Sequence, residues 1–419
     1  MVAAREKCQH YLPHKRRRCK FDVVPGKNVL RDIFEDEVER HKLICPAYCM
    51  LAAQRAAPYF KEDVSAGPPL CASDDPYAGV QALPTSAPLA ARRVELARQL
   101  GPAGLRALVS RISALARTLP PPATHVLNQE EAVRPPAVAG SVPPYSAKHA
   151  AQQASIVGNL GRVRLLEAAP CDAFVELGAG RGYLGAALSR HCPDLKTLVL
   201  VDCRGFKLKA DRELRHLDLH RLRCDLKDFH VRGCDPLARQ PDRRWVGFAK
   251  HLCGAATDFA LRAGVEQDRA GCRGLGIATC CHHRCGWQSF TGKAWFLRHG
   301  FLPFEFELVS WMTGWALCGH ETAQGSQEEA EDGSGGADCG PSALPESSPP
   351  TALDDSSAWD PHRLLPRTER IAIGLDCKAL IDAARLDYLK AAGMTAELVA
   401  YVAPDVSGEN KLPSGQGER

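Results

Sequence analysis

The chain has 419 residues, of which 45% are hydrophobic, and a formal net charge of +4, so it is long enough for one large domain with a buried core. No apolar run is long enough to cross a bilayer and the N-terminus lacks a signal-peptide core, so we expect an intracellular protein of the nucleus or cytoplasm that is not secreted. In such a reducing compartment, the 18 cysteines indicate metal ligands and buried thiols rather than disulfides.

Residues 1–50 form a short basic segment that is rich in cysteine and histidine. A segment this short cannot bury enough apolar surface to fold alone, so a structural zinc ion would explain its composition. His41 and Cys45 follow a helix-like stretch and are spaced to lie one turn apart. Together with Cys8 and Cys19 they make one candidate tetrahedral set. The alternative is a disordered basic tail with incidental cysteines.

Residues 51–144 are rich in proline, alanine and serine, which is typical of a linker. Within them, Leu, Val and Ile recur at helical spacing between positions 90 and 119. We therefore expect one or two helices carried on a flexible linker.

Residues 145–403 alternate strand-like and helix-like stretches, which predicts a mostly parallel sheet in an α/β domain. The polar face of the first helix either covers a ligand, reaches an RNA phosphate or is merely solvated; it carries Lys148, His149, Gln152 and Gln153. The five parallel strands are predicted at 173–177, 197–201, 219–224, 245–250 and 274–279. Segments 304–310 and 370–375 are predicted to add a closing antiparallel hairpin, which makes seven strands.

Residues 321–361 interrupt this domain with ten acidic residues and no Lys or Arg, in a tract low in apolar residues. We expect a disordered insertion in the hairpin connection. Without it, the rest of the chain carries a formal charge of +14, which suits a polyanionic partner such as RNA but is also common on solvated surfaces. Residues 404–419 are expected to be a disordered tail.

The stretch AFVELGAGRGYLGAA predicts a strand, a glycine turn and the start of a helix, which begins a nucleotide-binding α/β unit. Its glycines, Gly178, Gly180 and Gly182, let the backbone approach a ligand closely. A dinucleotide fingerprint needs its third glycine one position later, where Tyr183 stands. An acid at Glu176 followed by this spacing is the signature of S-adenosylmethionine methyltransferases. A glycine turn without a ligand is the alternative.

Polar residues follow the other predicted strands, at the edge where such folds bind ligands. Asp202 ends the second strand, where an acid accepts both ribose hydroxyls of a cofactor, and Asp225 follows the third, near the adenine. Lys250 and His251 end the fourth, where either one orients or deprotonates a substrate hydroxyl. The alternatives are that Asp225 is an ordinary surface acid and that Lys250 does not touch the substrate.

The fifth strand ends in TCCHHRC. Alternate side chains of an extended segment face opposite ways, so its two histidines and three cysteines cannot all bind one metal ion. A subset of them is a candidate metal site, with Cys253, Cys318 or His320 joining from elsewhere. The same residues are also candidates to line the substrate pocket, with a histidine such as His283 as base.

The series VELGAGRGYLG, KHLCG, ATCCHHRCGW, WMTGWALCGH and RIAIGLDCKALIDAARLDYL resembles the eukaryotic tRNA 2′-O-ribose methyltransferase family that modifies nucleotide four of the acceptor stem. The resemblance runs from about residue 148 to residue 402. It implies a Rossmann-like class I methyltransferase fold, S-adenosylmethionine as methyl donor, the tRNA acceptor stem as substrate and no DNA partner. Glu176 and the glycine loop would hold the methionine part of the donor.

The same resemblance implies an N-terminal CCCH zinc finger followed by a CHHC finger. Cys8 and Cys19 resemble the start of the first finger, and His41 and Cys45 the end of the second, whereas the segment between them is missing. Either these four ligands make one hybrid zinc site, or the module does not fold. Two other functions fit the residues: a methyltransferase for a protein or small molecule, and a zinc-finger RNA-binding protein with an impaired methyltransferase domain.

Overall fold

The computed structural model describes residues 46–71, 74–78, 87–127, 147–169, 171–206, 210–319 and 359–416, together with five two-residue strands nearer the N-terminus. These strands form two small sheets, in the orders β1-β4-β5 and β2-β3. They are Glu6–Lys7, Tyr11–Leu12, Arg17–Arg18, Asp22–Val23 and Asp32–Ile33. The predicted zinc ligands lie outside the described residues; they are Cys8, Cys19, His41 and Cys45.

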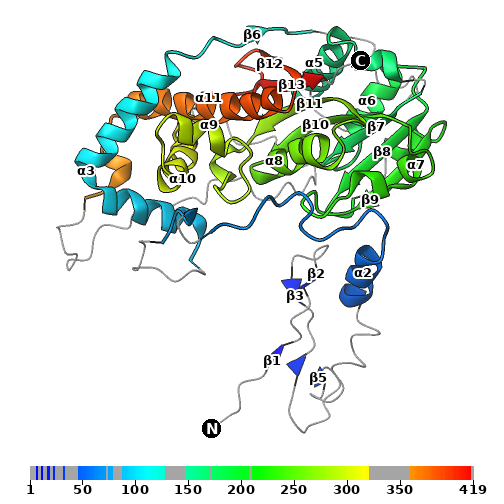
Figure 1. Cartoon of the computed structure of the whole chain (residues 1–419), viewed down its shortest axis with the longest axis horizontal. Coiled ribbons are helices and arrows are strands. Elements are labelled where there is room, and N and C mark those ends of the chain that lie inside the picture. Colours follow the sequence, from blue (N-terminus) through cyan, green and yellow to red (C-terminus); the bar gives the residue numbers. More distant parts are fainter. Residues whose placement is uncertain are drawn as a thin grey trace.

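An eight-stranded, mostly parallel sheet is the centre of the described part of the chain (Figure 1). Its order is β6-β12-β13-β11-β10-β7-β8-β9. Only β13 runs antiparallel to its neighbours, β11 and β12. The strands are β6 Ala123–Thr124, β7 Ala173–Leu177, β8 Thr197–Asp202, β9 Asp218–Arg223, β10 Trp245–Cys253, β11 Cys272–Cys280, β12 Thr395–Ala400 and β13 Lys411–Gln416.

The five predicted parallel strands are confirmed as β7 to β11. Helices cover both faces of this sheet, so its central strands are continuous apolar runs that a sequence reveals easily; every residue of β7 is buried. The predicted number of seven strands is wrong by one. The additional strand, β6, has two residues and no apolar run, and it pairs with β12 at the edge.

The predicted closing hairpin is wrong in position. Residues 304–310 lie in helix α10 (Pro303–Met312) and residues 370–375 in helix α11 (Arg367–Ala391). Nearly all of α10 is buried, and an apolar run without a polar face reads equally well as a strand or as a buried helix. The antiparallel hairpin is formed by β12 and β13 instead.

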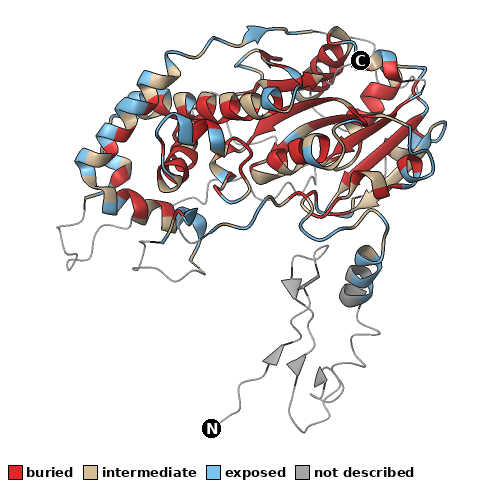
Figure 2. Ribbon diagram, viewed as in Figure 1, coloured by how far each residue is buried: buried red, intermediate tan, exposed pale blue. Residues whose placement is uncertain are grey.

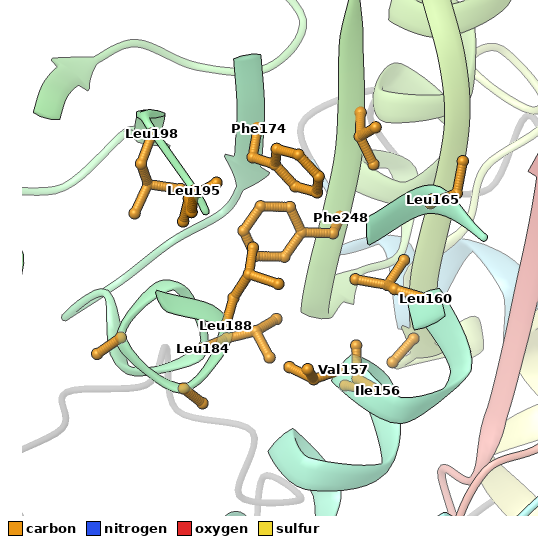
Figure 3. Close-up of a cluster of buried hydrophobic side chains, with 14 of the residues drawn as sticks. Ile156, Val157, Leu160, Leu165, Phe174, Leu184, Leu188, Leu195, Leu198 and Phe248 are labelled. Carbon is orange, nitrogen blue, oxygen red and sulfur yellow. The ribbon is translucent and has the colours of Figure 1, made fainter. Parts of the chain in front are cut away.

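Two hydrophobic clusters pack on opposite faces of the sheet, and a third lies beside it. The central strands of the sheet are largely buried (Figure 2). In the first cluster, α5 and α6 contribute Ile156, Leu160 and Leu184 against Phe174 and Phe248 of the sheet, whose rings meet edge to face at 6.3 Å (Figure 3).

Within the described residues, no helix has the length and apolarity needed to span a bilayer. The remaining α-helices are α2 Pro46–Arg55, α3 Leu89–Ala116, α5 Ala147–Arg162, α6 Tyr183–His191, α7 Asp235–Ala238, α8 Ala255–Arg262 and α9 Lys293–Arg298.

The predicted flexible linker contains a packed helix. α3 bends at Gly101, whose φ is +74°, and buries Leu96, Leu105, Leu108 and Ile112 in the third cluster together with α9, α10 and α11. The expectation of a disordered tail at 404–419 is also wrong, because residues 411–416 form β13 inside the sheet. Most of the predicted acidic insertion, residues 321–358, lies outside the described residues.

Candidate active site

The carboxyl ends of β7, β8, β9, β10 and β11 meet at one edge of the sheet, and the predicted glycine turn follows β7 there. Gly178, Gly180 and Gly182 have φ values of +71°, +52° and +81°, which favour glycine over other residues. A Cβ atom at Gly178 would lie 2.5 Å from Leu252, whereas a Cβ atom at Gly180 would meet nothing within 4 Å. The turn is therefore packed on the sheet at Gly178 and faces open space at Gly180.

Glu176 is a buried acid on β7, just before this turn. One of its carboxylate oxygens, Oε2, accepts a 2.8 Å hydrogen bond from the Gly185 N–H in the first turn of α6, where a helix dipole favours negative charge. Burial nevertheless raises the pKa of Glu176 to about 8, although the charges of Arg221 and Lys250 oppose the shift. The side chain thus satisfies one of the first N–H groups of α6.

Asp202 ends β8 against the same glycine turn. Its carboxylate oxygens accept hydrogen bonds from the N–H groups of Gly180 (2.9 Å) and Arg204 (2.8 Å). Each oxygen has a second lone pair, so the carboxylate keeps acceptor capacity for hydroxyl groups of a ligand. Asp225, which follows β9, is exposed and accepts a bond from the Lys227 N–H (3.0 Å).

Lys250 and His251 lie at an irregularity of β10. The pairing with β11 shifts register between Lys250 and Leu252, and His251 adopts a φ of +62°, a conformation that a non-glycine residue rarely takes. Burial lowers the pKa of Lys250 to about 7, against the opposing effect of Glu176. His251 is exposed at the surface, and desolvation by its neighbours, followed by the charges of Lys250 and His149, lowers its pKa, so its imidazole is neutral at pH 7.

The start of α5 faces this bulge. The rings of His149 and His251 lie 6.5 Å apart, and the charge of Lys148 contributes to the lowered pKa of Lys250. The predicted polar face of α5 is only partly present, because Gln152 and Gln153 are buried. The exposed Lys148 and the half-buried His149 are thus the residues that α5 brings to the sheet edge.

The cysteines and histidines at the end of β11 divide between two groups of contacts, in agreement with the expectation that they do not all bind one metal ion. Cys280 and Cys281 lie beside Cys253, and the sulfur atoms of Cys253 and Cys280 are 3.5 Å apart. His282 is buried against Asp382 of α11 at 2.8 Å. Buried Cys285 accepts a 3.1 Å bond from Arg385, also of α11.

His283 is held through its backbone by a residue that sequence analysis missed. Arg93 of α3 donates hydrogen bonds to the carbonyl oxygens of His283 and Cys285, and it forms a 2.7 Å ion pair with Glu307 of α10. Desolvation lowers the pKa of His283. Arg93 and Glu307 are 214 residues apart in sequence, and no local motif marks either of them.

Comparison with known proteins identifies the family of this chain. The family model "Methyltransferase TRM13" matches residues 151–413, and the model "CCCH zinc finger in TRM13 protein" matches residues 6–28. Within the latter range, the cysteines are Cys8 and Cys19.

Curated relatives are similar over the same region. The tRNA:m(4)X modification enzyme TRM13 homologs of Mus musculus and Homo sapiens are 31% and 32% identical, each alignment covering 63% of both chains. The tRNA:m(4)X modification enzyme TRM13 of Yarrowia lipolytica is 32% identical over 63% of this chain and 58% of its own length. The chain therefore spans less than two thirds of the length of these relatives. The methyltransferase model covers strands β7 to β12, the glycine turn, Asp202, Lys250 and His251, and the chain belongs to the TRM13 methyltransferase family.

Proposed function

We propose that this protein transfers a methyl group from S-adenosylmethionine to the ribose 2′-hydroxyl of nucleotide four in the acceptor stem of a tRNA. The observation that carries the proposal is the meeting of Glu176, the open glycine turn and Asp202 at one edge of a parallel sheet. The names of the relatives, which describe tRNA modification enzymes, support the choice of substrate. We also infer an intracellular location, in the nucleus or cytoplasm, where tRNA is found.

The residues around the turn fit the methyl donor. S-adenosylmethionine supplies an electrophilic methyl group on a cationic sulfonium. Glu176 pairs with its amino group, the backbone at Gly180 approaches its methionine part, and Asp202 accepts bonds from its ribose hydroxyls. Asp225 lies at the end of the adjacent strand, near the adenine.

Lys250, His251 and His283 are the residues we assign to the substrate hydroxyl. His251, neutral at pH 7, accepts a hydrogen bond from the hydroxyl and orients its oxygen, and one of these three residues takes the proton as the methyl group is transferred. Lys250 lies next to it in sequence and has a lowered pKa, so it contributes either charge or a second acceptor. His283 lies in the short turn that follows β11, the strand paired with β10.

Zinc binding by the N-terminal segment is a separate part of the proposal. We assign the ion to Cys8, Cys19, His41 and Cys45. The CCCH finger model over residues 6–28 supports the choice of Cys8 and Cys19, whereas His41 and Cys45 lie beyond the matched range. The role of this segment is to increase tRNA affinity, with A-form RNA met through backbone and shape contacts. Substituting Cys8 and Cys19 by serine should weaken tRNA binding while leaving donor binding unchanged, as measured by filter binding and calorimetry.

A transfer assay tests the reaction. Purified protein is incubated with tritiated S-adenosylmethionine and total tRNA that lacks the modification, and nuclease digestion maps the label. We expect a 2′-O-methyl nucleotide in the acceptor stem, lost in Asp202→Ala and retained in Asp218→Ala. Asp218 lies at the amino end of β9, away from the carboxyl ends of the strands, and its side chain is hydrogen-bonded to His220. Label on a base, on protein or on another nucleotide would overturn the substrate assignment.

A further inference from the structure

Three cysteine side chains gather where β10 and β11 end. Cys253 and Cys280 are direct neighbours across the two parallel strands, and Cys281 follows immediately. The three sulfur atoms all lie within 4.8 Å of one another. Cys280 is buried, whereas Cys253 and Cys281 are half-buried, so the cluster is reachable from solvent.

An unusual backbone conformation creates this arrangement. Adjacent residues of a regular strand point to opposite faces, which would separate the side chains of Cys280 and Cys281. Cys281 instead has a φ of +48°, in the left-handed region, and its sulfur lies on the same side as that of Cys280. Such a conformation is unfavourable for a non-glycine residue and persists where the surrounding structure or a ligand compensates for it.

The sulfur separations match a metal site better than a disulfide. A tetrahedral zinc ion with Zn–S bonds of about 2.3 Å holds its sulfur ligands about 3.8 Å apart. The 3.5 Å between Cys253 and Cys280 is close to this value and far longer than the roughly 2.05 Å of a disulfide bond. The neighbouring His282 and Cys285 are held by α11 and are not part of the cluster.

We propose that Cys253, Cys280 and Cys281 bind one zinc ion through their sulfur atoms, with a water molecule in the fourth position. Each thiol loses its proton to solvent when the ion binds. The ion links the end of β10 to the end of β11, and so fixes the segments that carry Lys250, His251 and His283 relative to each other. The proposal does not depend on the methyl-transfer reaction, because metal binding is measured directly.

The test uses the full chain in a background that lacks the N-terminal ligands: Cys8→Ser, Cys19→Ser, His41→Ala and Cys45→Ser. Zinc content is measured by inductively coupled plasma mass spectrometry, and cobalt is then exchanged in to record the thiolate-to-cobalt absorption band. We expect one metal per chain with that band. Both should be lost in Cys253→Ser and in Cys281→Ser, and retained in the control Cys272→Ser at the other end of β11.

A second measurement covers the case in which a serine variant does not fold. In the background protein, zinc should protect these three cysteines from iodoacetamide, and a chelator should expose them together, as peptide mass spectrometry will show. Absence of bound metal, a cobalt spectrum without the thiolate band, or a disulfide between Cys253 and Cys280 would each overturn the proposal.

Discussion

Gly178 and Gly180 share a positive φ but differ in what surrounds them. Leu252 closes the space at Gly178, whereas the space at Gly180 is open and faces the proposed donor site. A side chain added at Gly178 would therefore disturb the packing of the turn, whereas one added at Gly180 would occupy only the space in which the ligand is proposed to lie.

Substituting Gly180 by alanine should abolish tight donor binding at a small cost in stability. A residue with a side chain in the left-handed region costs about 1–2 kcal/mol, and the added methyl group occupies the space where the donor lies in our proposal. Gly393→Ala is the matched control, because Gly393 has a φ of +74° and equally open surroundings far along the chain at the end of α11. Thermal unfolding should shift similarly in both variants, and only Gly180→Ala should lose affinity by calorimetry, by at least about tenfold or 1.4 kcal/mol. Equal affinities would contradict the proposed approach.

Donor binding should also depend on pH through Glu176. The pKa of this acid is raised to about 8, so it is largely protonated at pH 7, and pairing with a cationic amino group requires that it lose its proton. Affinity should therefore fall about tenfold per pH unit below pH 8, with proton release on binding at pH 7.

Calorimetry in two buffers with different ionisation enthalpies measures that proton release. Glu176→Gln should bind weakly, with no pH dependence from this group. An affinity of the unsubstituted protein that stays constant from about pH 6 to about pH 8 would rule out the role of Glu176.

At the residue scale, the sequence predicts the places of Glu176 and Asp202 in the fold better than the contacts of the two histidines after β11. Glu176 and Asp202 sit at predicted strand ends, where position and residue type agree. The adjacent His282 and His283 look alike in sequence, yet only His282 is buried against Asp382, which is 100 residues away in the chain. Long-range pairing of this kind leaves no local pattern.

At the scale of elements, α3 connects a region outside the sheet to the candidate site. Its Arg93 joins Glu307 of α10 to the carbonyl groups of His283 and Cys285. The helix is recognisable from the spacing of its apolar residues, but its partner is not, because the ion pair joins distant segments.

Arg93→Ala should destabilise the protein by about 3–5 kcal/mol, because it leaves the buried Glu307 charge without its partner. Arg98→Ala on the same helix is the control. Its side chain is 50% exposed and pairs with Glu95 on the surface, so the expected change is below about 1 kcal/mol. Urea unfolding followed by circular dichroism measures both, and similar losses would show that the buried pair is not specifically stabilising.

Strands and helices differ in how well the sequence specifies them here. β7 and β8 are predictable because their apolar runs are buried on both faces. β13 is not, because KLPSGQ combines a proline and a glycine with one leucine and has little intrinsic preference for a strand. β13 is a strand because its backbone pairs with β11 on one side and with β12 on the other.

At the scale of the whole molecule, β13 joins the edge strands β12 and β6 to the rest of the sheet. Leu412→Ala should cost about 2–5 kcal/mol, because this side chain is 1% exposed and belongs to the cluster under α5 and α6. Leu375→Ala, at a position that is 53% exposed on α11, should change stability by about 0.5 kcal/mol. Denaturant midpoints measure both changes, and a Leu412 variant as stable as the control would contradict the packed position of β13.

The order of the strands also governs how the protein folds during its synthesis. The ribosome makes β11 well before β13, and at about 5–20 residues per second the interval between Cys280 and Lys411 lasts roughly 7–26 seconds. Throughout that interval the nascent sheet has an unpaired β11 edge, which is a template for pairing with other chains. We expect the yield of folded protein in cells to follow the chaperone capacity around translating ribosomes more closely than it follows the stability of the completed fold.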